Sequence, residues 1–283
     1  MADNAPQTQY RDEYVAAYEQ KQTLLRQTVT TEAQVKGNTA VFLVAGSGGA
    51  AATTRGLNGL ITARADSNTQ NSCVLQEWHD LVRKTGFNIF ESQGNQQQLM
   101  QDTSVMVINR KTDALIVAAL DTGTVSIGSS STIPNTSLFW NAVVKLQNAD
   151  VPWDANITLL CQPSFLAYLQ QATEFASADF VSTMPYDKGN VPLWNDMPMV
   201  YVWNNVKVIS HPNLTGKGTS SESSYVYHKS SIGHAMDTKG LDTAIGYNDE
   251  QQYSYARASG FMGVKVLQNS GIVVITHDGS AYA

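Results

Sequence analysis

Apolar positions recur at helical spacing in two stretches of the chain. Residues 10–28 are good helix formers and place Tyr14, Ala17, Tyr18, Leu24 and Leu25 near one stripe. This pattern predicts an amphipathic arm, which has no partner of its own nearby and must dock on this chain or on another copy.

The second stretch, residues 95–120, contains neither glycine nor proline. Val105, Ile108, Thr112, Leu115 and Ala119 repeat there at three- and four-residue spacing. At 1.5 Å per residue a helix over this stretch is roughly 39 Å long, well above the average length. The pattern therefore predicts a long helix that organises a flat or elongated body.

Strand-like patterns surround a glycine-rich segment before this helix. Val35 and residues 41–44 favour a strand, and the sequence GSGGAAATTRGLNG then supplies small and turn-forming residues. A loop of this composition buries too little to order itself, so residues 34–64 are predicted to form an extended hairpin that is ordered against a neighbour. Residues 73–90 alternate partly between apolar and charged positions, and we expect them to be mostly β-strand with one wet face.

The Gly-, Ser- and Thr-rich residues 121–134 mark the crossing to a second unit. The later patterns predict a helix at 137–148, a strand at 157–161, a helix at 165–171, and strands within 199–211 and 225–228. This order is typical of an α/β unit. Two further strands, 253–267 and 272–275, are expected to return to the body that holds the long helix. No internal repeat is present.

Composition points to a surface that meets other proteins. Charged residues make up 15% of the 283 residues, against about 25% in typical soluble domains. Protein interfaces are depleted in Lys, Glu and Asp, so the many neutral polar residues suit a surface built for neighbours. The net charge of -6 argues against tight binding of nucleic acid. The sequence contains no secretory signal and no apolar run long enough to span a membrane. Its two cysteines, Cys73 and Cys161, are expected to be unpaired, partly buried thiols in a reducing compartment.

Motifs of enzymes are weak in this sequence. The segment Gly46–Ala51, GSGGAA, matches a dinucleotide fingerprint, with Asp66 about 20 residues further on. The fingerprint requires a helix directly after its glycines, and Thr53, Thr54 and Gly56 disfavour one, so a flexible loop is the favoured interpretation. The five histidines have no metal-ligand spacing, and neither a G-x-S-x-G elbow nor a P-loop lysine occurs. We therefore expect no enzyme activity, no cofactor and no metal site.

Aromatic residues concentrate in the second unit. Trp140, Trp153, Trp194 and Trp203 lie there with several tyrosines. Base stacking would need a basic groove beside the rings, whereas the lysines of this unit are scattered among acids. Packing in the core and at interfaces is therefore the preferred role of these side chains.

Several segments together resemble the major capsid proteins of tailed bacteriophages, in particular a short-tailed-phage group. They are RDEY and TVTTEA near the start, RGLNGLI at 55–61, WHDLVRKTGFNIFESQGN at 78–95, VPWD at 151–154, FASADFV at 175–181, GYNDEQQYSYARAS at 246–259 and QNSGIVV at 268–274. No segment is a sharp signature alone. Their order along nearly the whole chain carries the resemblance.

The resemblance implies an α+β chain with the Hong Kong 97-type fold. Its parts would be an N-terminal arm at 1–32, an E-loop at 33–72, a P-domain with the long spine helix at 73–124 and 246–283, and an A-domain at 125–245. In such shells A-domains meet at the axes of hexamers and pentamers, while arms and E-loops reach over neighbouring subunits. The implied function is self-assembly into the icosahedral shell around the double-stranded DNA genome. An encapsulin-like nanocompartment shell and, further away, a dinucleotide-binding oxidoreductase remain the alternatives.

The E-loop would supply the contacts between subunits. The candidate contact residues are Lys36, Gly46, Gly48, Gly49, Arg55, Asn58 and Arg64. For Arg55 and Arg64 a solvated side chain is an equal alternative. Some relatives join subunits by an isopeptide bond from an E-loop lysine, but Lys36 lies at the base of the loop, so no crosslink is expected.

The resemblance also implies partners beyond the chain itself. We expect a separate scaffolding protein, a portal at one vertex and a decoration protein as possible partners. Packaged DNA would be contacted weakly and without sequence specificity. The protein would assemble in the bacterial host cytoplasm and end in the virion capsid.

Overall fold

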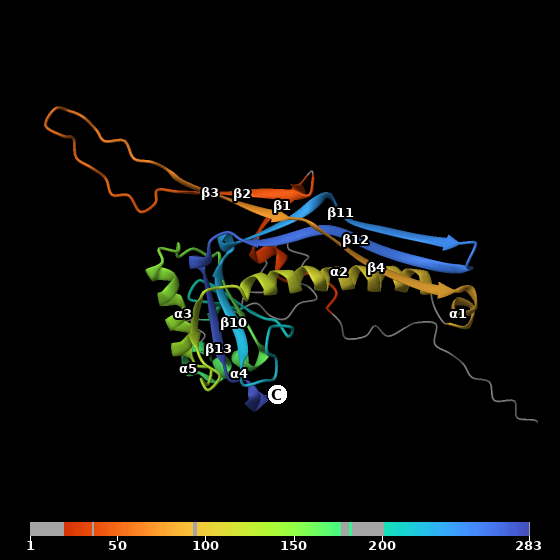
Figure 1. Ribbon diagram of the computed structural model, residues 1–283. Helices are drawn as coiled ribbons and strands as arrows, with labels where there is room; N and C mark the ends of the chain where they lie inside the picture. The colour runs from red at the N-terminus through yellow and green to blue at the C-terminus, as the bar shows by residue number, and fades with distance from the viewer. Residues whose placement is uncertain (1–19, 36, 93–94, 177–180, 183–200, 283) are drawn as a thin grey trace, which may run out of the picture.

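A computed structural model describes residues 20–35, 37–92, 95–176, 181–182 and 201–282. One sheet and one long helix form an extended layer (Figure 1). The strands of this sheet, in spatial order, are β1 (Thr30–Val35), β11 (Ile232–Asn248), β12 (Tyr253–Val266) and β4 (Gln76–Thr85). β1 runs parallel to β11, and the other neighbours are antiparallel. Helix α2 (Gln96–Leu120) covers one face of this long sheet.

Helix α2 confirms the predicted long helix. The side chain of Asn95 accepts a hydrogen bond from the backbone N–H of Gln98, which satisfies one donor at the start of the helix. The buried positions include a regular four-residue series: Met100, Ser104, Ile108, Thr112, Ile116 and Leu120. Ile108 packs on Ala258 and Met262 of β12. The buried stripe is thus rotated slightly from the predicted one, whose members Val105 and Leu115 are half-buried.

A second, seven-stranded sheet forms the other layer. Its strands, in spatial order, are β5 (Val125–Gly128), β13 (Ile272–His277), β10 (Glu222–His228), β6 (Ile157–Cys161), β9 (Val206–Ser210), β8 (Tyr201–Trp203) and β7 (Val181–Ser182). Three helices pack with it: α3 (Thr136–Asn148), α4 (Pro163–Gln171) and α5 (Thr173–Ala176). Short 3-10 turns occur at Arg26–Thr28, Lys229–Ser231, Asn269–Gly271 and Ser280–Tyr282. The predicted α/β unit is confirmed in its helices and its central strands.

The core of this unit is rich in aromatic side chains. Trp203 is buried and stacks on Phe139, with ring centroids 4.6 Å apart. Trp140 and Trp153 are 39% exposed, and Trp194 lies outside the described residues. The expected packing role therefore holds fully for Trp203, which belongs to the hydrophobic core cluster of this unit.

The two layers share one hydrophobic cluster. Ile116 and Leu120, at the end of α2, pack with Ile272 and Val274 of β13 and with Leu25 of the N-terminal segment. The long helix therefore begins on the long sheet and ends in the core beneath the seven-stranded sheet. None of the described helices has the length and apolar character needed to cross a membrane.

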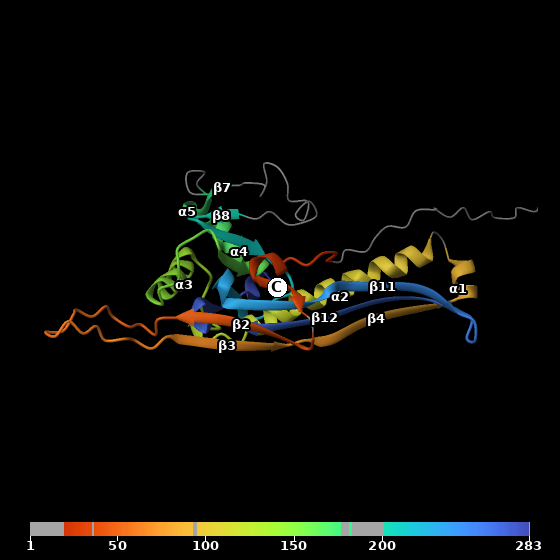
Figure 2. The same ribbon diagram turned by 90° about the horizontal axis from the view of Figure 1, so that it is seen from above.

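A two-stranded hairpin extends from one end of the body. Strands β2 (Thr39–Gly46) and β3 (Ser67–Val74) pair in register from Thr39 with Val74 to Gly46 with Ser67. Residues 47–66 connect them and project beyond the body, as the orange loop in Figure 1 shows. Viewed from above, this loop and the short helix α1 (Gly86–Glu91) lie at opposite ends of the long axis (Figure 2).

Three sequence predictions are corrected by this fold. Within the predicted helix at 10–28, residues 20–28 contain only the 3-10 turn Arg26–Thr28, because the amides of Leu24 and Leu25 bind the buried Asp113. The expected strand at 73–90 stops at Thr85, whose side chain caps the start of α1. Strand β13 joins the seven-stranded sheet instead of returning with β12 to the long sheet, because it pairs with β5 and β10.

Candidate intersubunit surface

The hairpin is fixed at its base and free along its length. Ala40 and Cys73 are buried in a small cluster with Val35 and Ala235. Phe42 lies over Gly233, where a Cβ would come within 2.9 Å of its ring. From residue 45 to residue 70, by contrast, every residue is exposed. The loop thus has the properties predicted from its composition: it is carried by the body but buries nothing against it.

The glycines of the loop allow its turns. Gly48 and Gly49 have φ values of +64° and +72°, a left-handed conformation that L side chains rarely adopt. A Cβ on Gly46 would lie 3.3 Å from the carbonyl oxygen of Ser67. Since no helix follows these glycines, the GSGGAA segment lacks the strand-turn-helix context that a dinucleotide site requires.

The charged and polar residues that are candidates for intersubunit contact lie at different places along the loop. Arg64 forms an ion pair with Asp66 at 3.3 Å and donates to the carbonyl oxygen of Ser47 at 3.4 Å. It therefore ties the two sides of the loop together near its base. Arg55 and Asn58 are exposed further out, and Lys36 lies outside the described residues. For Arg64, the structure thus gives an intramolecular contact in addition to the two roles considered from the sequence.

The tip of the loop carries apolar side chains that the sequence analysis did not single out. Leu57, Leu60 and Ile61 have relative exposures of 109%, 75% and 63%. A tight turn brings them together, because Gly56 donates to the carbonyl of Leu60 at 3.1 Å and Gly59 to that of Gly56 at 2.9 Å. The available signal was the presence of large apolar residues in a segment with no core to enter.

Helix α1, at the opposite end of the body, exposes a second group of apolar side chains. Phe87 is 71% and Phe90 86% exposed, and this helix buries none of its residues. Tyr253 pairs with Thr85, so the turn between β11 and β12 lies at the same end as α1 (Figure 1). Asp249 and Glu250 in that turn, and Glu91 in α1, are exposed. We call Phe87, Phe90, Glu91, Asp249 and Glu250 the α1 end.

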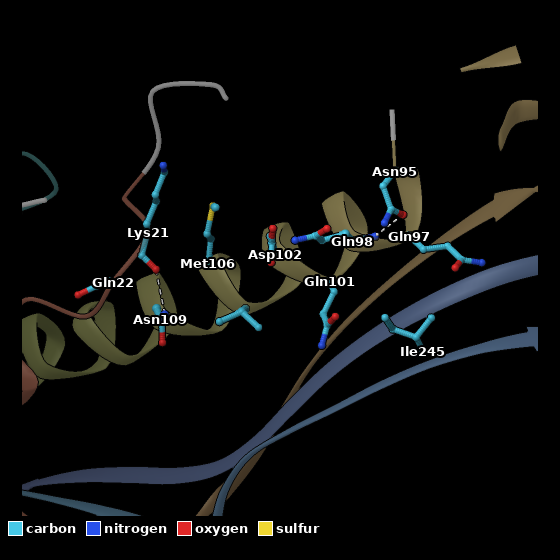
Figure 3. A pocket seen from close by; sticks show the side chains of 11 residues that line it. Lys21, Gln22, Asn95, Gln97, Gln98, Gln101, Asp102, Met106, Asn109 and Ile245 are labelled. Atoms are coloured by element: carbon cyan, nitrogen blue, oxygen red, sulfur yellow. Dashed lines mark hydrogen bonds between the residues drawn. The ribbon is translucent and has the colours of Figure 1, made fainter. Parts of the chain in front are cut away.

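A polar groove of about 660 Å³ lies between the N-terminal segment and the first half of α2 (Figure 3). Its lining is mostly amide side chains, including Gln97, Gln98 and Gln101, with Met106 and Ile245 beside them. Asn109 donates to the carbonyl oxygen of Lys21 at 2.9 Å and fixes one wall. Lys21 and Asp102 also line the groove, so its charged groups are one amine and one carboxylate among neutral amides, which only form hydrogen bonds.

The buried Asp113 of α2 anchors the described part of the N-terminal segment. Its carboxylate accepts hydrogen bonds from Thr23 Oγ1 at 2.8 Å, from the N–H of Leu24 at 2.8 Å and from the N–H of Leu25 at 3.2 Å. The side chain of Gln20 donates to the same carboxylate. Because Asp113 is only 1% exposed, these donors supply the hydrogen bonds that water would otherwise give its oxygens.

Three buried residues, Ser224, His277 and Glu222, follow one another in space in the order of a hydrolase triad, but the last link is too long for a hydrogen bond. Ser224 Oγ lies 2.9 Å from His277 Nε2, and His277 Nδ1 lies 3.7 Å from Glu222 Oε2. Ser224 and His277 are both 0% exposed, and burial lowers the pKa of His277 to about 4. Glu222 also accepts from the N–H of Gly218 at 2.7 Å. A serine that no substrate can reach is not a nucleophile, so this network belongs to the core.

The cysteines and the possible metal ligands form no further candidate site among the described residues. Cys73 and Cys161 are free and buried, which confirms that they are unpaired. Burial raises the pKa of Cys161 to about 12, so its thiol stays protonated. Among the described residues, no cluster of three or more His, Cys, Asp and Glu side chains is arranged to hold a metal ion.

Comparison with known proteins agrees with this geometry. The family model for phage capsid proteins matches residues 2–279. The capsid asymmetric unit of cyanophage Pam1 superimposes with a TM-score of 0.73 at 11% identity, covering 99% of this chain and 98% of that chain. Mycobacterium phage Che8 gives a TM-score of 0.72 at 16% identity, with coverage of 97% and 98%. The capsid of Ralstonia phage GP4 gives 0.72 at 12% identity, with coverage of 98% and 96%. No curated protein matches the sequence.

Proposed function

The chain belongs to the phage capsid protein family, and from this membership we propose that the exposed hairpin joins neighbouring copies of it into the shell. The protein is a major capsid protein with the Hong Kong 97-type fold and forms the shell of a bacteriophage virion. It acts as a structural protein. The encapsulin-like alternative is disfavoured because the matching family model describes phage capsid proteins.

The loop from 47 to 66 carries the proposal of hairpin-mediated contacts. Its residues are all exposed in the single chain, yet they include Leu57, Leu60 and Ile61, which a free surface does not favour. Gly46, Gly48, Gly49, Arg55, Asn58 and Arg64 shape or flank this loop, and we propose them, together with Lys36, as the residues that meet an adjacent copy. Apolar area buried at about 25 cal/mol per Å² then drives association.

The division into regions is part of the same proposal. Residues 1–32 would be the arm and 33–72 the E-loop. The long sheet with α2 would be the P-domain, and the seven-stranded sheet with α3 and α4 the A-domain. The strand pairing supports two changes to the expected bounds: β11 belongs with the P-domain from Ile232 onward, and β13 belongs with the A-domain.

Further partners follow from the role of a shell subunit. We propose hexamers and pentamers as the assembly units, built in the host cytoplasm, with a scaffolding protein, a portal and a decoration protein as additional contacts. The net charge of -6 favours weak, non-specific contact with packaged double-stranded DNA. A dissociation constant below about 1 µM for free subunits on duplex DNA at physiological salt would contradict the DNA part of the proposal.

A shortened hairpin tests the function of the loop. Residues 47–66 are replaced by Asn-Gly, which joins the paired residues Gly46 and Ser67 by a two-residue hairpin turn. We expect a folded subunit with an unchanged circular dichroism spectrum, and no regular shells by electron microscopy. The control variant Lys217→Ala changes an exposed residue outside the hairpin and should form shells. Normal shells from the shortened variant would contradict the proposal.

A further inference from the structure

We propose that the loop tip of one copy, formed by Leu57, Leu60 and Ile61 with Arg55, docks on the α1 end of a second copy. The inference rests on the proposed function, because it specifies where on the neighbour the hairpin binds. It assigns to Phe87 and Phe90 a role that neither the fold nor the sequence patterns require.

Exposure selects these two surfaces among all apolar side chains that the structure describes. The four most exposed large apolar residues are Leu57 at 109%, Phe90 at 86%, Leu60 at 75% and Phe87 at 71%. All four lie in the loop tip or in α1. Isolated apolar residues on a surface are common, but two clusters that hold the extreme values in a self-assembling protein indicate contact surfaces.

The charges of the two surfaces are complementary. Residues 47–66 contain Arg55, Arg64 and Asp66 as their charged groups, and Asp66 is paired with Arg64. Arg55 is left as an exposed cation beside the apolar tip, with no ion pair among the described residues. At the α1 end, Glu91, Asp249 and Glu250 are exposed carboxylates. Opposite charges around an apolar contact favour its correct pairing over the pairing of like surfaces.

The nearby cations of the α1 end are already engaged. Lys84 Nζ donates to Gln96 Oε1 at 2.6 Å, and the guanidinium of Arg83 lies over the ring of Tyr253, 4.9 Å from its centroid. Both cations keep their charge, but the three exposed carboxylates Glu91, Asp249 and Glu250 outnumber them at this end.

The arrangement of the two surfaces requires a second copy. The tip and α1 lie at opposite ends of the long axis in both views, so one chain cannot bring them together (Figures 1 and 2). Two different surfaces in contact form a heterologous interface, which joins copies head to tail and closes into a ring when the rotation fits. A tip-to-tip contact would instead bring like cations together.

Cysteine pairs test the contact directly. One preparation carries Leu60→Cys and a second carries Phe90→Cys; the native Cys73 and Cys161 are buried and give little background. The two are mixed, assembled and treated with a short bis-maleimide. We expect a covalent dimer whose crosslinked peptides join positions 60 and 90, and little dimer from either variant alone. In the matched control, Ile133→Cys, an exposed apolar position before α3, replaces Leu60→Cys and should give little dimer.

Two outcomes of this experiment would overturn the inference. One is efficient crosslinking of Phe90→Cys with itself, which would show that α1 ends meet each other. The other is shells that form normally by electron microscopy without the 60–90 crosslink. Failure of the wild-type chain to form shells at all would instead count against the proposed function, so the two failures are distinguishable.

Charge reversal provides a second, independent test. Arg55→Glu should slow shell formation about tenfold at low salt, since exposed charges act mainly on association rates. Adding Glu91→Lys and Asp249→Lys should restore the rate, whereas Lys217→Glu, an exposed control in the other layer, should leave it unchanged. No effect of Arg55→Glu, or no rescue by the acidic-end changes, would contradict the proposed pairing.

Discussion

Replacing Asp113 by alanine should release the N-terminal segment from helix α2. The carboxylate accepts from the backbone amides of Leu24 and Leu25, and both of these residues are buried. A buried donor left without a partner costs about 1–3 kcal/mol. Two such donors should reduce the free energy that favours the docked segment by about 3 kcal/mol. The solvent-accessible donors Gln20 and Thr23 add less. Since 1.4 kcal/mol is a factor of ten, the undocked population should rise by about 150-fold.

Proteolysis measures this population. Trypsin cleaves after basic residues, and Arg26 lies in the anchored segment. When opening is fast compared with cleavage, the cleavage rate follows the open fraction. We expect Asp113→Ala subunits to be cut after Arg26 about a hundredfold faster than wild type. Asp113→Asn should be intermediate, because its amide keeps one acceptor oxygen.

Asp102→Ala provides the matched control, because Asp102 lies on the same helix but faces the polar groove. Its cleavage rate should equal that of the wild type. An increase of less than about fivefold in Asp113→Ala would refute the reasoning, since it would mean that the segment is held by its apolar residues and by β1 rather than by the carboxylate.

Three further predictions concern stability and reactivity. Burial lowers the pKa of His234 and of His277 to about 4 from an ordinary 6.5, so the unfolded chain binds more protons and the free energy of unfolding should fall as pH drops from about 6.5 toward 4. The free energy of unfolding measured by urea titration should be lower at pH 5 than at pH 7 by about 2 kcal/mol per histidine. In His234→Gln this pH dependence should shrink by the contribution of His234. A free energy of unfolding that does not change with pH would contradict these shifts. Gly128→Ala should lower the free energy of unfolding by more than about 2 kcal/mol, because its Cβ would lie 2.2 Å from the Thr276 carbonyl oxygen at a φ of +78°. Gly240→Ala, which has a positive φ but open space around it, should lower it by about 1 kcal/mol. Equal melting temperatures of the two variants would contradict this difference. The thiol of Cys161, fully buried with a pKa raised to about 12, should react with a thiol reagent only after denaturation, and rapid labelling of the native protein would be the contrary result.

The sequence predicted those elements whose pattern is local. The absence of glycine and proline in 95–120 located α2 to within one residue at its start. The glycine-rich segment identified the projecting loop, because composition alone decides that it cannot bury itself. Strand β6 and helix α3 followed from apolar runs bounded by turns.

Elements that depend on tertiary partners were missed. Strand β11 was not predicted, because its second half mixes exposed and half-buried residues, among them Lys239 and Asp242. Its pairing with β1 and β12 makes it a strand. The segment 20–28 has helical propensity but is held out of a helix by Asp113, which is about 90 residues away in sequence. No local signal contains such a contact.

The sequence predicted the projecting loop but not the apolar chemistry of its tip. Glycines and arginines drew attention to the loop, whereas the apolar residues at its tip and in α1 were passed over. Their apolar character is visible in the sequence, but their exposure is not, because the same residues would be ordinary core positions in another fold. Exposure is a property of the whole molecule, and it is what distinguishes Phe87 and Phe90 from a buried helix face.

Helix α2 has a mechanical consequence, because its two halves serve different cores. Its first half rests on β12 and its last turn is embedded with Ile272 and Val274 of β13. Rotating one layer against the other would remove Leu120 from that cluster, which costs several kcal/mol of packing free energy. We therefore expect the subunit to behave as a stiff plate. A closed polyhedron needs both flatter and more sharply bent junctions from one kind of plate. We therefore expect the variation in curvature to be taken up at the seams between plates rather than by a hinge inside the chain.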